Sequence, residues 1–241
     1  MIVDTTQIEA TLDEAERAVS SGSPIGPTGF WRAVAAVKRE PNLVEQYADR
    51  IARIDRAALK GWALITLPLW LGNVVAVGAV LIGLVLVAWA YSLEGTASGI
   101  TFLIGFGIVL TATHGLAHLV AGRLMGMRFT HWFVASLKQP QPGVKLDYST
   151  YLRAPATSRA WMHASGAIVT KVMPFAFIGA ALAAAIPAWA VTVLLLVGVG
   201  QIASDLLWST KSSDWKKFKR EMALSSPGGA GEESSTDQSM S

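Results

Sequence analysis

Four long runs of apolar residues occupy the middle and the second half of the chain, separated by short polar stretches. They cover approximately residues 63–90, 99–124, 160–186 and 188–208. A helix needs roughly 20 residues to cross a hydrocarbon core about 30 Å thick, so each run is long enough to span a membrane. The pattern predicts an all-α polytopic membrane protein with four transmembrane helices within residues 61–210.

The segments on either side of these runs follow different patterns. In residues 1–60 apolar positions recur at helical spacing, which predicts an amphipathic helical region. We expect it to pack on the membrane domain or to lie on the lipid surface, rather than to form a separate binding module. In residues 211–224 aromatic and basic residues are mixed, which predicts either an interfacial helix or a cluster that sets orientation. Glycine, serine and acidic residues predict a disordered tail over 225–241.

Composition supports a location in the lipid bilayer. Hydrophobic residues make up 52% of the chain and charged residues only 15%, which is too apolar for an ordinary soluble domain. The formal charge of +3 is too small to argue for a nucleic-acid partner. Because the sequence contains no cysteine, any transition metal must be held by His, Asp or Glu.

The distribution of lysine and arginine predicts the orientation. These residues gather before the first run, between the second and third, and after the fourth, whereas residues 91–98 and the turn at Pro187 have none. By the positive-inside rule, both termini and the central loop are expected on the cytoplasmic side, most simply of the cell membrane. In that loop, residues 128–136 and 144–152 flank a proline and glycine turn, which predicts a small cytoplasmic β-hairpin. Its edge offers a place for an extended peptide, although an ordinary connection is the alternative.

Few ionisable side chains fall inside the predicted spans, and each needs a reason because it costs about 2.5–3.5 kcal/mol there. They are His114, His118, Lys171 and Asp205. Two histidines four residues apart lie on one helical face and can coordinate one metal ion. His114 lies about 14 Å inside Arg123, and Asp205 lies about 9 Å inside Lys211, when the distances are counted along a helix. This similar depth allows a three-ligand site, the arrangement of catalytic zinc.

Two simpler interpretations stay open for these residues. The histidine pair can serve as a hydrogen-bonding contact between helices. Asp205 can pair with Lys171 instead of binding a metal.

The stretches around these residues resemble the site-2 intramembrane metalloprotease family over roughly residues 105–210. Residues 114–118 and 121–126 are similar to the family's histidine helix and the glycine after it, and residues 164–170 match the position of its small-residue segment. Residues 204–206 match the place of its distal aspartate. The resemblance implies zinc bound by His114, His118 and Asp205, and cleavage of peptides within or beside the membrane.

Several departures from the family pattern fall on its chemistry. Gly115 stands where the family has the glutamate that takes a proton from the attacking water, and no glutamate occurs in any predicted span. Ala167 and Thr170 replace a proline and an asparagine, and Leu206 replaces a glycine. A general base typically contributes about 10²- to 10⁴-fold, so its loss should cripple turnover and leave metal binding intact. Lys171 can replace the base only if burial lowers its pKa.

The sequence therefore predicts a proteolytically impaired relative that binds zinc and a transmembrane or peptide segment. An active protease that uses a different base is the first alternative. A haem-binding helix bundle, with His114 or His118 paired to His163, is the second.

Overall fold

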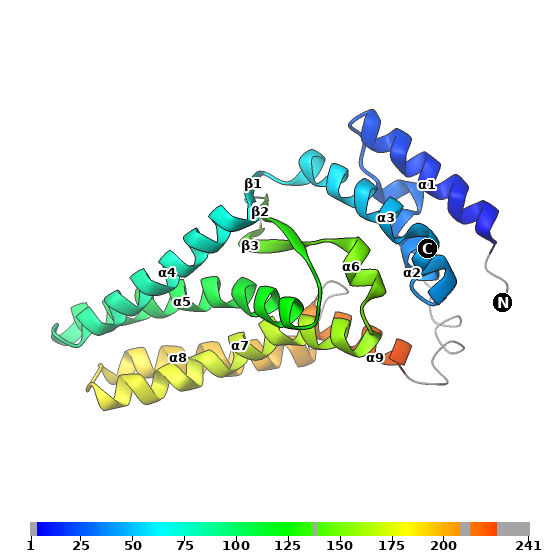
Figure 1. Cartoon of the computed structure of the whole chain (residues 1–241). Helices are drawn as coiled ribbons and strands as arrows, with labels where there is room; N and C mark the ends of the chain where they lie inside the picture. The colour runs from blue at the N-terminus through cyan, green and yellow to red at the C-terminus, as the bar shows by residue number, and fades with distance from the viewer. Residues whose placement is uncertain (1–3, 137–138, 208–212, 226–241) are drawn as a thin grey trace.

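The molecule consists of a bundle of long helices and a smaller helical region (Figure 1). The computed structural model describes residues 4–136, 139–207 and 213–225. Four long helices run side by side at one end, and the N-terminal helices lie at the other end. A small sheet lies where the two parts meet, beside the first pair of long helices.

Helices joined by short connections make up the described N-terminal region. Its elements are α1 (Thr5–Ser20), the short 3₁₀ helix η1 (Gly26–Thr28), α2 (Phe30–Val37) and α3 (Pro41–Trp62). Their apolar faces form one buried cluster that includes Leu12, Phe30 and Ile51 and continues into Leu119 and Met162 of the long helices. The N-terminal helices therefore share one core with the ends of the long helices, and α3 packs against α6, the short helix that precedes α7.

The long helices meet the requirements for membrane spans. They are α4 (Leu69–Ala90), α5 (Gly95–Leu124), α7 (Ala156–Ala183) and α8 (Ala188–Leu207). All four are long and apolar enough to cross a membrane, as the hydropathy pattern predicts. The first begins at Leu69 and not near residue 63, because Ile65–Pro68 form strand β1. A short apolar strand directly before an apolar helix continues the hydrophobic run, so hydropathy alone does not separate the two.

Glycines bring α4 and α5 into close contact. A Cβ atom added to Gly105 would lie 2.6 Å from the carbonyl oxygen of Gly83, and one added to Gly83 would lie 2.8 Å from the carbonyl oxygen of Gly105. The two backbones therefore touch at this point, which larger side chains would prevent. By contrast, a Cβ atom added to Gly107, on the same helix, would meet nothing within 4 Å.

The sheet contains the predicted hairpin and one strand that was not expected. Strands β2 (Phe129–Ser136) and β3 (Gln139–Leu146) pair antiparallel, which confirms the hairpin, and β1 pairs antiparallel with β2. The order β1-β2-β3 leaves β3 at an edge of the described sheet. Pro140 and Pro142 of this edge strand have no backbone N–H group to donate to another strand.

Two helices complete the described chain. The second strand was expected to reach residue 152, but β3 ends at Leu146 and α6 (Tyr148–Arg153) follows. The side chain of Asp147 accepts a hydrogen bond from the backbone N–H of Ser149 at 3.1 Å and starts this helix. The basic helix expected over residues 211–224 is α9 (Asp214–Ser225), which packs against α7. The tail predicted to be disordered lies outside the described residues, apart from Ser225.

We expect Gly105→Ala to lower the melting temperature of the purified protein in detergent. The new methyl group collides with the backbone of Gly83, and such overpacking costs about 1–3 kcal/mol. The matched control is Gly107→Ala, whose methyl group meets open space and should leave the melting temperature unchanged or raise it. Equal melting temperatures for the two variants would contradict the close packing of α4 and α5.

Candidate metal centre

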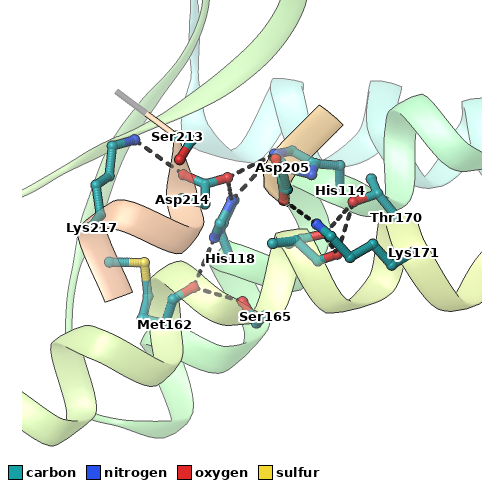
Figure 2. Close-up of polar contacts among 12 residues, drawn as sticks. His114, His118, Met162, Ser165, Thr170, Lys171, Asp205, Ser213, Asp214 and Lys217 are labelled. Atoms are coloured by element: carbon teal, nitrogen blue, oxygen red, sulfur yellow. Dashed lines mark hydrogen bonds and ion pairs between the residues drawn. The ribbon is translucent and has the colours of Figure 1, made fainter. Parts of the chain in front are cut away.

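The histidine pair lies on one face of α5, as its spacing predicts. His114 and His118 are one helical turn apart, and their Nε2 atoms face each other at 3.3 Å. Both side chains are largely buried, with 19% and 12% of their surfaces exposed. The two rings therefore direct their Nε2 atoms at a common point beside the helix (Figure 2).

A carboxylate from a distant part of the chain completes the group. Asp214 is the first residue of α9, and its Oδ2 atom lies 3.1 Å from Nε2 of His118 and 3.4 Å from Nε2 of His114. The three donor atoms lie within 4.8 Å of one another (Figure 2). Within the part of the chain that the structure describes, this is the one cluster of His, Asp or Glu residues with the spacing of a metal site.

Helix α7 fixes the orientation of His118. The Nδ1 atom of this ring lies 2.8 Å from the carbonyl oxygen of Met162. A Cβ atom at Gly166 would lie 2.3 Å from the same imidazole, so only glycine lets α7 come this close. Since a carbonyl can only accept a hydrogen bond, Nδ1 carries the proton and the Nε2 atom of the neutral ring presents a lone pair. This lone pair faces the Asp214 carboxylate, an arrangement that a cation between them stabilises.

A lysine supports the carboxylate from its other side. Lys217 donates a hydrogen bond to Oδ1 of Asp214 at 3.0 Å. Burial raises the pKa of Asp214, but the contacts with His114 and His118 and the charge of Lys217 lower it more, so the net pKa is far below its usual range. Asp214 is therefore ionised near neutral pH, which is the state a metal ligand needs.

Asp205, which the resemblance implies as the third ligand, lies elsewhere in the same region. Its Oδ2 atom forms an ion pair with Nζ of Lys171, and it is not a member of the group formed by the histidines and Asp214. The structure thus brings together the two predicted histidines but places the predicted carboxylate with the lysine, which is the alternative left open by the sequence. Residues of both sets line one cavity of about 730 Å³: Lys171 and Asp205 from the ion pair, and His114 and Asp214 from the metal-site group.

The place of the missing glutamate is filled by an aromatic ring. A Cβ atom added to Gly115 would lie 2.6 Å and 2.8 Å from two carbons of the Trp132 indole. Trp132, on β2, is only 4% exposed, and its Nε1 donates a hydrogen bond to Oδ1 of Asn73 at 2.8 Å. The sheet therefore occupies the space next to the histidine helix where a longer side chain at residue 115 would have to go.

The other residues singled out in the sequence have contacts of their own. The hydroxyl of Thr170 donates to the carbonyl oxygens of Gly166 and Ala167 in its own helix, both at 3.0 Å. The Nε2 atom of His163 lies 2.9 Å from the hydroxyl of Tyr151. The side chain of Leu206 is outside the described part of the structure. Neither Thr170 nor His163 directs its polar group at the histidine pair.

The sequence pattern does not predict Asp214 as a ligand, because this residue lies outside the four apolar spans. This residue precedes Trp215 and two lysines, in a stretch that reads as a basic interfacial helix. The available signal was its position: an acidic residue at the start of a helix, close to the end of the last span.

No family model, no curated protein and no solved structure matches this chain.

We expect Gly115→Ala to lower the melting temperature, because its methyl group enters the space of the Trp132 ring. Gly107→Ala, on the same helix, serves as the control. Trp132→Leu removes the ring, so the effect of Gly115→Ala should shrink in that background, with a coupling of about 0.5–3 kcal/mol in a double-mutant cycle. Additive effects of the two substitutions would contradict the contact.

Proposed function

We propose that this protein is an integral membrane protein of site-2-protease type that holds zinc and binds a membrane-protein segment without cleaving it. The metal ligands are His114, His118 and Asp214. The observation that carries this proposal is the spacing of their donor atoms beside a polar cavity between the long helices.

The spacing fits a tetrahedral ion. Ligands about 2.0–2.1 Å from a tetrahedral zinc ion lie about 3.3 Å from one another. The separations among the three donors are 3.1, 3.3 and 3.4 Å. Two imidazoles and one carboxylate, without thiolates, are a donor set that zinc accepts, with a fourth position left for a ligand. The carbonyl of Met162 supplies the outer partner that holds such a histidine in one tautomer.

The surroundings of the ligands support binding more than catalysis. When bound, zinc would act as a Lewis acid toward a carbonyl oxygen of the bound segment. Among the described residues lining the cavity, Asp214 is used as a ligand and Asp205 is paired with Lys171. The indole of Trp132 fills the position from which a glutamate would act. Without a free carboxylate in reach, proton transfer should be slow.

The shape of the cavities favours a transmembrane segment as the ligand. An apolar groove of about 580 Å³ lies between α4, α5 and the sheet, and Leu103, Gly107 and Thr111 line it along one face of α5. Thr111 also lines the polar cavity that contains His114, so the groove and this cavity adjoin at Thr111. A ligand with an apolar helix and an unwound polar end would fit this arrangement, with the helix in the apolar groove and the polar end in the polar cavity. The edge of β3 is a weaker site for an extended peptide, because its two prolines cannot donate hydrogen bonds.

We further propose that the ligand cluster lies toward the cytoplasmic side of the cell membrane. The lysines and arginines that flank the spans support this orientation, because they gather at the ends of the long helices nearest to the sheet and α9.

The purified protein should contain close to one zinc ion per chain. His114→Ala, His118→Ala and Asp214→Asn should each weaken zinc affinity by at least about 100-fold, since loss of an outer partner alone typically costs 10- to 100-fold. The matched control is Asp205→Asn, which removes a nearby carboxylate that is not in the cluster and should retain zinc. Metal analysis measures the zinc content of each variant, and competition with a chelator measures its zinc affinity. Loss of zinc in Asp205→Asn with retention in Asp214→Asn would instead support the ligand set that the family resemblance implies.

A reconstituted transmembrane substrate should remain intact with the unaltered protein and zinc. A carboxylate at residue 115 requires room, so the informative variant is the double substitution Gly115→Glu with Trp132→Ala. Cleavage that appears only in this variant, and disappears with His118→Ala, would support an impaired protease. Zinc-dependent cleavage by the unaltered chain would overturn the proposal in favour of an active enzyme with another base.

A further inference from the structure

Helix α9 carries a second buried carboxylate besides Asp214. Glu221 lies about two helical turns after Asp214 and is only 4% exposed. Its Oε1 atom lies 2.5 Å from Nζ of Lys38 and accepts a hydrogen bond from the hydroxyl of Tyr151 at 2.8 Å. Its Oε2 atom accepts a hydrogen bond from Nε of Arg159 at 2.6 Å. A carboxylate is rarely buried unless it has partners of this kind.

These partners come from three separate parts of the fold. Lys38 caps the end of α2, Tyr151 belongs to α6, and Arg159 belongs to the first turns of α7. The side chain of Glu221 therefore connects α9 to the N-terminal helices, to α6 and to the start of α7.

Asp214 and Glu221 lie on the same face of α9, because residues seven apart in a helix are almost in line. Between them, Phe218 packs against Trp161 of α7 with ring centres 5.4 Å apart, and Lys217 contacts Asp214. The face that points Asp214 at the histidines is thus anchored at its far end by Glu221 and along its length by the ring of Phe218.

We propose that Glu221 is a positioning residue for the metal centre. Its carboxylate connects α9 to the N-terminal helices and to α7, and so holds Asp214 against His114 and His118. This inference rests on the proposed metal site, and it assigns a role to the N-terminal helices: through Lys38 they help to place the third ligand.

A second buried ion pair provides a matched control. Nζ of Lys145 lies 2.6 Å from Oδ1 of Asp55, and the two residues are 8% and 2% exposed. This pair joins α3 to β3, and among the described residues neither member forms a hydrogen bond or an ion pair with α9. Breaking it should disturb the same end of the molecule without moving Asp214.

The experiment uses the full chain in detergent with Co²⁺ in place of Zn²⁺, because the visible spectrum of Co²⁺ reports its coordination. Glu221→Gln should weaken Co²⁺ binding by about 10- to 100-fold, as expected for the loss of a supporting interaction, and should change the spectrum in the same way as Asp214→Asn. Asp55→Asn should lower the melting temperature but leave Co²⁺ affinity and spectrum as in the unaltered chain.

Lys38 tests the connection to the N-terminal helices separately. Lys38→Met should weaken Co²⁺ binding, whereas Lys38→Arg keeps the charge and should restore it. These variants also carry the test if Glu221→Gln does not fold.

Each remaining outcome overturns the inference in a different way. If the unaltered chain binds Co²⁺ and Glu221→Gln or Lys38→Met binds it with the same affinity and spectrum, the metal site stands and the positioning role fails. If Asp55→Asn weakens binding as much as Glu221→Gln, the effect is one of general stability and the role fails as well. If the unaltered chain binds neither Co²⁺ nor Zn²⁺, the proposed function fails together with the inference.

Discussion

The close approach of α5 and α7 at His118 is the contact on which the rest of the candidate site depends. Gly166 removes the side chain that would keep the helices apart, and the Met162 carbonyl then fixes one nitrogen of the imidazole. With that nitrogen engaged, the other can face only His114 and Asp214. A small residue on one helix thereby sets the direction of a ligand on another, which is a common use of glycine between membrane helices.

The low dielectric of a membrane interior explains why the polar groups occur in separate, paired sets. An isolated charge there is costly, so Lys171 and Asp205 neutralise each other while Asp214 faces the histidines and Lys217. The pairing of Asp205 and Lys171 also accounts for a feature of the sequence. A carboxylate in a span is a good candidate for a metal ligand only if no cationic side chain lies at a similar depth, because the two would otherwise pair, as Asp205 and Lys171 do.

Much of the fold and the histidine pair follow from sequence patterns, whereas Asp214 and the contact of Trp132 with Gly115 do not. Hydropathy indicates the four spans, and the spacing of His114 and His118 indicates that they act together. The third carboxylate depends on how α9 folds back onto α7. Trp132 reaches Gly115 only because β2 places this ring against both Gly72 of α4 and Gly115 of α5. Such contacts join residues far apart in the chain, and local periodicity carries no information about them.

The contact between Gly115 and Trp132 also limits which substitutions this protein can accumulate during evolution. A glutamate introduced at residue 115 meets a buried indole before it reaches the cavity, so that single substitution is expected to damage the fold. A carboxylate becomes tolerable only after the ring has been replaced, and replacing the ring first leaves a void beside Gly72 and Gly115. Each path thus passes through a less stable intermediate, and selection for stability alone would keep residue 115 closed to a carboxylate.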